Sequence, residues 1–472
     1  MKKKIVSLVL SAAMTCSLLA GCGAANQPAA PAADAATEEA APAAEETAEA
    51  PAAEETAEAA PAADASGEKF YIYSWNTELQ DRLEYVFEVY PELRDQVVYV
   101  NVGDDKVYQE KIDGLLQAPD TEEYPDMIAF EAAYIMKYTN SDYTLPITDL
   151  GLTEADLSEM YPYTIDIAKD KRDGSIKGLS WQSCPGSFMY RTDLAEKYLG
   201  VTSPEEMQAK VDTWDKFIET AKELKEASND ATRILSSNGD VSNVFYANKT
   251  QPWVDDAGVF HMDDAMKEYM EISKTLETED LTQKTTTWTD AWNAGPSTDD
   301  VLGYFGCTWF LHWTIKANCG GEKVGEGTYG LWNMCQGPAP YYWGGTWLGA
   351  TKDCSNKEVA GKIMKALCTD TDVMKKMSEE TLDYVNNKAA MQALSDEGKG
   401  SYEFLGGQDF ISVFMPLADK VDVSWMSAYD QKVNDLLGTQ IEQYQLGEKD
   451  LDTAIKDFEA SVKEQYPNIT IE

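Results

Sequence analysis

The chain has 472 residues, with 82 acidic and 39 basic side chains and a formal net charge of −43 at neutral pH. An acidic surface of this size argues against nucleic acid or anionic lipid as a partner and favours a neutral or cationic ligand, although solvated acidic faces are common. The length is sufficient for two lobes with separate cores.

The first residues look like a targeting segment. Three lysines, Lys2 to Lys4, precede an apolar run over residues 5–20 that is too short to span a bilayer. The run ends in "LAGC" (19–22), which resembles a bacterial lipoprotein signal, and a plain secretory signal is the alternative. The resemblance implies a signal peptide over 1–21, cleavage before Cys22 and lipid on the Cys22 sulfur. We therefore expect a protein anchored by lipid alone on the extracytoplasmic side of the cell membrane.

A spacer is expected next. Residues 24–68 contain eleven acids and no base, aromatic or large aliphatic residue, and "PAAEETAEA" occurs at 42–50 and again at 51–59. Such a segment cannot bury enough apolar area to offset its ordering entropy. With the lipidated Cys22, we expect residues 22–68 to form a disordered, acidic Ala/Glu/Pro tether.

Strands and helices alternate from residue 69 onward. Apolar runs and helical periodicity predict strands over 69–75, 96–102 and 125–131 and helices over 77–93, 106–118 and 132–140. This order predicts a parallel sheet covered on both faces, with ligands bound beyond the carboxyl ends of the strands. Trp75 and Glu131 stand at two of those ends.

Six segments, in order, resemble the extracellular solute-binding proteins of family 1, the maltose-binding type of sugar ABC transporters. They are "YPDMIAF" (124–130), "LPITDLG" (145–151) and the segments 178–200, 203–226, 301–313 and 344–370. The chain departs from the family where "VLGYF" replaces an Ala-Met pair, and 240–300 aligns only loosely.

This resemblance implies an α/β fold of two lobes, joined by a hinge of crossing strands, with a ligand cleft between them. The N-terminal lobe is expected over 69–183 and 340–395, and the C-terminal lobe over 184–339 and 396–472. The family further implies a binding protein without enzymatic activity that captures a carbohydrate and delivers it to ABC permease subunits, and we expect a monomer. The many aromatic residues that could stack on sugars favour an oligosaccharide over a monosaccharide. The alternatives are a lipid-anchored glycan-acting enzyme, for which no spaced carboxylate motif stands out, and a surface adhesin or peptide-binding lipoprotein.

Aromatic residues supply most of the candidate site. Sugars pack their C–H faces on aromatic rings and offer hydroxyls to polar groups, and eight tryptophans lie between 253 and 347. In "APYYWGGTW" (339–347), Gly344 and Gly345 are expected to turn the backbone at the hinge, while Trp347 and Trp214 are assigned to the core and Trp253 is left open. The predicted ligand-binding residues are Trp75, Asn76, Glu131, Trp181, Gln182, Trp309, Trp313, Trp343 and Trp425.

Metal and cofactor chemistry has little support in the sequence. The two histidines, His261 and His312, are far apart, and no C-x-x-C pair occurs, so we expect neither a metal site nor a cofactor. Six cysteines follow Cys22, and both free thiols and one or two disulfides remain possible.

Overall fold

The structure is a computed structural model that describes residues 69–103 and 105–471. The expected signal peptide (1–21), the lipidated Cys22 and the tether (22–68) lie outside the described residues. Within the described ranges, no helix combines the length and the apolar composition needed to cross a membrane.

A five-stranded sheet forms the centre of the first lobe. Its order is β2-β1-β3-β9-β4, and its strands are β1 (Phe70–Ser74), β2 (Val97–Asn101), β3 (Met127–Glu131), β4 (Leu179–Ser180) and β9 (Thr346–Ala350). Strand β1 pairs in parallel with β2 and β3, as predicted. Strand β9 joins from far along the chain and runs antiparallel to both β3 and β4, so the complete sheet is mixed.

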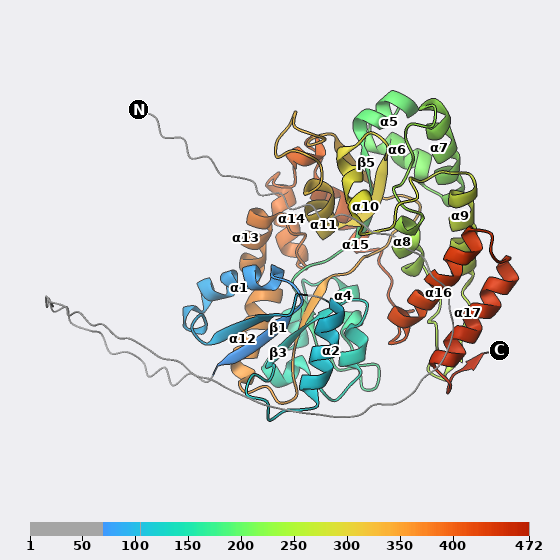
Figure 1. The fold of residues 1–472 in the computed structure, drawn as a ribbon. Helices are drawn as coiled ribbons and strands as arrows, with labels where there is room; N and C mark the ends of the chain where they lie inside the picture. The colour runs from blue at the N-terminus through green and yellow to red at the C-terminus, as the bar shows by residue number, and fades with distance from the viewer. Residues whose placement is uncertain (1–68, 104, 472) are drawn as a thin grey trace, which may run out of the picture. The chain divides into compact units, whose positions relative to one another are not determined.

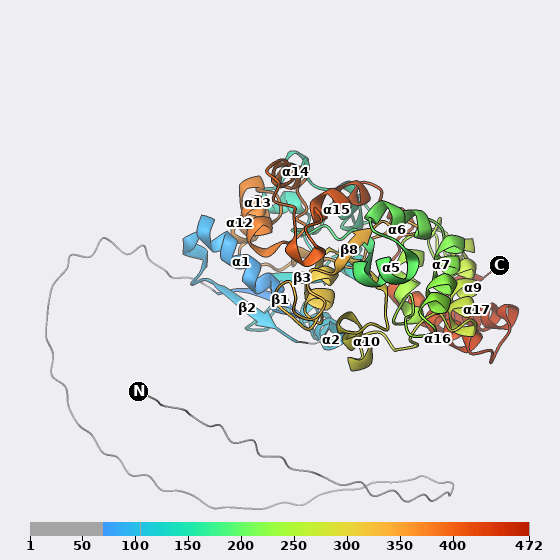
Figure 2. The same cartoon turned by 90° about the horizontal axis from the view of Figure 1, so that it is seen from above.

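Helices cover both faces of this sheet. Helices α1 (Glu78–Val89) and α12 (Lys357–Cys368) lie side by side on one face, and α2 (Asp105–Leu116) lies on the other (Figures 1 and 2). Leu79, Leu83, Val86 and Phe87 form the buried stripe of α1, as their spacing predicts.

The second lobe is built on a smaller, antiparallel sheet. Its order is β7-β5-β8, from β5 (Gly186–Arg191), β7 (Gly303–Cys307) and β8 (Trp332–Cys335). Strands β5 and β7 are buried along their whole length. Two short strands, β6 (Val259–Phe260) and β10 (Thr470–Ile471), pair separately.

The remaining helices complete the two lobes. The α-helices are α3 (Ile135–Thr139), α4 (Pro162–Ile167), α5 (Thr192–Leu199), α6 (Pro204–Val211), α7 (Trp214–Ala227), α8 (Ser242–Tyr246), α9 (Asp264–Thr278), α10 (Asp290–Ala294), α11 (Thr308–Phe310), α13 (Thr371–Thr381), α14 (Lys388–Asp396), α15 (Phe410–Ala418), α16 (Asp430–Gln445) and α17 (Leu451–Gln465). Short 3-10 turns span Pro91–Leu93, Ile147–Leu150, Glu154–Leu157, Asn238–Val241, Gly295–Ser297 and Glu403–Leu405, and a π-helical stretch, η6, spans Leu311–Lys316. Helices α16 and α17 pack together at the carboxyl end of the chain (Figure 1).

The chain passes between the two sheets through extended segments. Residues 181–185 connect β4 to β5, and residues 336–345 connect β8 to β9. The two crossing segments touch through an isolated bridge between Pro185 and Tyr342. Two lobes joined by crossing strands are therefore present, as predicted. The predicted lobe changes after 183 and 339 fall within these segments, and the exact boundary residues stay a prediction.

Candidate functional site

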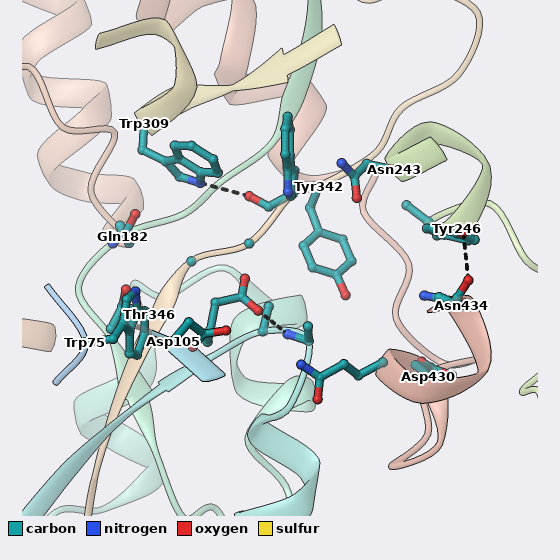
Figure 3. Close-up of a pocket in the computed structure, with 18 of the residues that line it drawn as sticks. Trp75, Asp105, Gln182, Asn243, Tyr246, Trp309, Tyr342, Thr346, Asp430 and Asn434 are labelled. Atoms are coloured by element: carbon teal, nitrogen blue, oxygen red, sulfur yellow. Dashed lines mark hydrogen bonds between the residues drawn. The ribbon is translucent and has the colours of Figure 1, made fainter. Parts of the chain in front are cut away.

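A cavity of about 680 Å³ lies where the two lobes and the crossing segments meet. Figure 3 shows side chains from all three regions converging on it. It lies at the carboxyl ends of β1 and β3, the place expected of a ligand site in an α/β sheet.

The first lobe contributes residues at the carboxyl ends of its strands. Trp75 and Asn76 come immediately after β1, and Glu131 is the last residue of β3. The Trp75 ring lies edge-on to Tyr108 and Tyr134, with centroid separations of 5.6 and 6.1 Å. These contacts hold the indole at the rim of the lobe's core while part of it faces the cavity.

The crossing segments contribute the part of the wall nearest the hinge. Gln182 comes from the first segment, and Tyr342, Trp343 and Gly344 come from the second. Gly344 has a φ of 65°, and a Cβ at this position would lie 2.9 Å from Glu131 Oε1. Glycine is therefore required both by the left-handed backbone and by the close approach of the Glu131 carboxylate.

The second lobe adds a cluster of tryptophans. The Trp309 indole N–H donates to the Trp343 carbonyl at 3.1 Å (Figure 3), and the two rings meet edge-on at 5.2 Å. Trp288 stacks beside Trp309 at 6.3 Å with an interplanar angle of 18°. Trp313 also lines the cavity. It belongs to the π-helical stretch that directly follows α11, the helix that carries Trp309. Trp288 and Trp313 are 53% and 59% exposed, so their rings are open to a ligand.

Amide and hydroxyl groups face this cluster from the far side of the cavity. Asn243 and Tyr246 come from α8, and Asn434 comes from α16 (Figure 3). The Tyr246 hydroxyl donates to the Asn434 carbonyl at 3.4 Å, and the Asn434 side-chain oxygen accepts from the buried Trp253 indole at 2.7 Å. The Asn434 amide is thereby held in place as a partner for ligand hydroxyls.

Trp425 closes the wall near the start of α16. Its side chain is mostly buried and stacks on Tyr342 with a centroid distance of 6.5 Å. The Lys249 ammonium lies 4.6 Å from the Trp425 ring centroid and 3.1 Å from Asp430 Oδ1. Burial lowers the pKa of Lys249, and the Asp430 carboxylate counteracts this effect.

The structure brings eight of the nine predicted ligand residues to one cavity. The residues that line it are Trp75, Asn76, Glu131, Gln182, Trp309, Trp313, Trp343 and Trp425. Their contact with a ligand stays a prediction. The core assignment of Trp347 agrees with its burial, and Trp253, which the sequence left open, is fully buried.

Trp181 does not join this set. Its side chain is fully buried in the core and does not line the cavity. Successive side chains of an extended segment point to opposite sides. Because the neighbouring Gln182 faces the cavity, Trp181 points away from it, and its assignment to the ligand site is corrected.

Sequence reasoning missed several cavity residues, above all Trp288. This residue sits in "TTTWTDAW" (285–292), within the stretch that aligned only loosely with the family, and no strand or helix periodicity marks it. Its φ of 69° places a bulky residue in left-handed backbone, a strain of roughly 1–3 kcal/mol that tends to occur at functional sites. A tryptophan flanked by threonines on both sides, outside any periodic pattern, was the available signal.

Two carboxyl groups of the cavity are shifted toward the protonated form. Burial raises the pKa of Glu131 to about 7, helped by the negative charge of Asp105 and opposed by the hydrogen bond from the Ala133 N–H at 2.6 Å. Burial also raises the pKa of Glu78 to about 7, with repulsion from Asp383 adding to the effect. Both groups stand in a site that disfavours uncompensated negative charge.

Metal and thiol chemistry are not evident in the part of the chain that the structure describes. No group of three or more His, Cys, Asp or Glu side chains there is arranged to hold a metal ion. The six cysteines after Cys22 are free, and five of them are buried. Between the two possibilities that the sequence left open, the structure has free thiols.

Comparison with known proteins places this geometry in context. Residues 95–402 match the family described as bacterial extracellular solute-binding proteins. No curated protein matches the sequence.

Solved structures resemble the chain in fold. An extracellular solute-binding protein of family 1 superposes with a TM-score of 0.71 at 16% identity, covering 84% of this chain and 99% of that chain. An ABC-transporter-associated binding protein from B. animalis subsp. lactis Bl-04, in complex with β-1,6-galactobiose, has a TM-score of 0.66 at 19% identity, with 86% and 100% covered. A galacto-N-biose/lacto-N-biose I-binding protein from Bifidobacterium longum, in complex with lacto-N-biose, has a TM-score of 0.66 at 15% identity, with 87% and 100% covered.

Proposed function

We propose that this chain, which belongs to the family of bacterial extracellular solute-binding proteins, captures a carbohydrate and delivers it to the permease of an ABC transporter. The observation that carries the proposal is the cavity, in which tryptophans face amides and carboxylates drawn from both lobes. Aromatic rings suit the C–H faces of sugars, and the polar groups suit their hydroxyls. Two proteins of similar fold are described in complex with β-1,6-galactobiose and with lacto-N-biose, which supports this choice of ligand.

The number of rings favours an oligosaccharide over a monosaccharide. Trp75 lies on the first lobe, Trp343 on the crossing segment, and Trp288, Trp309 and Trp313 on the second lobe. One sugar ring occupies the faces of two aromatic rings at most, so rings on three sides suit several units. A volume of about 680 Å³ lies within the usual range for small-molecule sites, about 300–1,000 Å³.

Capture is expected to involve rotation of the lobes about the crossing segments. Hinge closure around a ligand is the usual motion of binding proteins of this type. Gln182 and Tyr342 line the cavity from the hinge itself, so a bound sugar would contact both lobes and their connection.

Calorimetry against a panel of oligosaccharides, followed by product analysis, tests this function. Saturable heat with no new products supports carbohydrate capture. Turnover of any glycan would establish the enzyme alternative, and binding restricted to a peptide library would establish the peptide-binding one. Absence of binding to every carbohydrate in the panel contradicts the proposal.

Lipid anchoring completes the proposed role, because a tethered receptor stays close to its permease. The support is the sequence of residues 1–22 alone. The Cys22→Ala variant should move from the membrane fraction to the soluble fraction. Membrane attachment that survives this change would contradict the lipoprotein assignment. A single species at the monomer mass in light scattering tests the expected monomer.

A further inference from the structure

We propose that the carbohydrate captured in this cavity carries a positively charged amino group, as an amino sugar does at neutral pH. The inference rests on the proposed function and narrows it to one class of ligand. It is drawn from the charges and rings around the cavity.

The charged side chains that line the cavity have one sign. Glu78, Asp105, Glu131 and Asp430 are among the lining residues. Among the described residues that form this wall, none is a lysine, arginine or histidine. The ligand therefore meets carboxylates without meeting a protein cation.

Cations behind the wall are already engaged by carboxylates. Lys249 lies 3.1 Å from Asp430. Arg82 donates to both oxygens of Asp383, at 2.6 and 3.0 Å, and stands 3.9 Å from Glu78. Lys249 thus compensates Asp430, whereas Arg82 is shared between Asp383 and Glu78.

Glu131 is in a different situation. Its carboxylate accepts a hydrogen bond from a neutral donor, the Ala133 N–H, at 2.6 Å. A Cβ at Gly344 would lie 2.9 Å from Glu131 Oε1 and 3.3 Å from Trp309 Nε1, so the carboxylate and the Trp309 indole flank the same point of the crossing segment. A buried carboxylate holds an ammonium group through charge-assisted hydrogen bonds.

The hydrogen-bonding groups of the cavity and of the ligand also favour a cationic ligand. An ionised carboxylate only accepts hydrogen bonds, whereas an ammonium group only donates them, with three N–H bonds and no acceptor. A neutral sugar hydroxyl both donates and accepts, and it would leave the negative charge at Glu131 uncompensated. Burial raises the pKa of Glu131 to about 7, so an ammonium group beside it would favour the ionised form, whereas a neutral hydroxyl would not.

The tryptophan faces add a second attraction for a cation. Trp288 and Trp313 are the most exposed rings of the cavity, and Trp309 contacts both Trp288 and Trp343. The negative face of an indole attracts a cation within about 6 Å of its centroid, and tryptophan is the best of the aromatic residues in this respect. An amino sugar satisfies both features, since its C–H face stacks while its ammonium group pairs with a carboxylate.

Calorimetry at pH 7 with matched ligand pairs tests the inference. Each pair consists of an amino-sugar oligomer and its N-acetylated counterpart, in the gluco, galacto and manno series from one to four units, with neutral glycans of equal length alongside. For the best-binding series, the free amine should bind at least about tenfold more tightly than the acetylated form.

The outcomes separate this inference from the proposed function. Equal or tighter binding of an N-acetylated or neutral glycan refutes the cationic ligand and leaves carbohydrate capture standing. Failure of every glycan to bind overturns both.

A variant that removes the Glu131 charge tests whether this carboxylate causes the preference for the free amine. Glu131→Gln keeps the side-chain shape and an oxygen that accepts from Ala133, so the fold is expected to persist. We expect at least about tenfold weaker binding of the free amine and a clearly smaller loss for the acetylated form, so that the preference for the amine falls. Glu268→Gln, at an exposed position of α9, is the matched control and should leave both affinities unchanged. Equal binding of the amine by wild type and Glu131→Gln contradicts the inference, and a thermal melt confirms that each variant is folded.

Discussion

Trp309 and Trp292 lie in the same aromatic cluster but in different surroundings. Trp309 lines the cavity, whereas Trp292 is 1% exposed and its indole N–H donates to Asp240 at 2.8 Å. Trp309→Ala should therefore weaken carbohydrate binding by about 2 kcal/mol or more, roughly thirtyfold in the dissociation constant, with a nearly unchanged melting temperature.

The matched variant Trp292→Ala should behave in the opposite way, with a loss of stability of roughly 3–5 kcal/mol. Calorimetry and thermal melts on both variants supply the comparison. A sharp fall in the melting temperature of Trp309→Ala, with normal binding by the protein that remains folded, would assign Trp309 to packing.

Glu131 makes stability depend on pH in an unusual direction for a carboxyl group. Its folded pKa of about 7 exceeds the ordinary value of 4.5, so its contribution to stability is fully present below pH 4.5 and is lost as pH rises through 7. Each pKa unit is worth about 1.4 kcal/mol, so between pH 5 and 8 the ligand-free protein should lose about 2 kcal/mol more stability than Glu131→Gln.

Denaturant unfolding of both proteins at the two pH values measures this difference. The comparison cancels the contribution of His312, whose pKa is lowered to about 4 by burial and whose effect on stability has the opposite sign. Parallel pH profiles for wild type and variant would mean that Glu131 is ionised normally in the folded state.

At the residue scale, the sequence predicts best those ligand-site side chains whose place at the end of a strand determines where they point. Trp75 directly follows β1 and Glu131 is the last residue of β3, and both line the cavity. Trp181 lies in an extended crossing segment, where a shift of one residue changes the side to which the side chain points. Trp288 depends on a loop with left-handed backbone, which no periodicity predicts.

At the scale of elements, the crossing segment around Gly344 connects the hinge to the site. Gly344→Ala should weaken carbohydrate binding, because the new methyl group would press on Glu131 and Trp309. It should also cost about 1–2 kcal/mol of stability, because the left-handed backbone disfavours a side chain.

Gly398 provides the control for this change. Its φ of 70° matches the 65° of Gly344, but nothing lies within 4 Å of a Cβ there. Gly398→Ala should lose comparable stability while its affinity is unchanged. Equal affinities of the two variants, measured by calorimetry, would show that the crossing segment does not position the binding residues.

Local elements were predicted well and their long-range pairing was not. The expected strands and helices between 69 and 140 all occur, because each carries its own apolar periodicity. The antiparallel β9 (Thr346–Ala350) pairs with β3 (Met127–Glu131), which lies far earlier in the chain, and pairing over such a separation leaves no local pattern. The π-helical stretch that carries Trp313 was not predicted either, because no apolar periodicity marks it.

At the scale of the whole molecule, the two-lobe architecture was predicted from the resemblance to solute-binding proteins and not from the apolar periodicity of the sequence. Six ordinary segments in a fixed order indicated a fold whose sheets are built from distant parts of the chain. The cavity forms only when those parts come together, which explains why individual site residues such as Asn243 and Asn434 carried no signal of their own.

A structure of the protein with its bound carbohydrate tests the central claim most directly. We predict a sugar ring packed within about 4 Å of the Trp309 indole, with polar contacts to Asn76 or Glu131 on the first lobe and to Asn243 or Asn434 on the second. A carbohydrate bound on the outer surface of one lobe, with this cavity occupied only by water, would contradict the account.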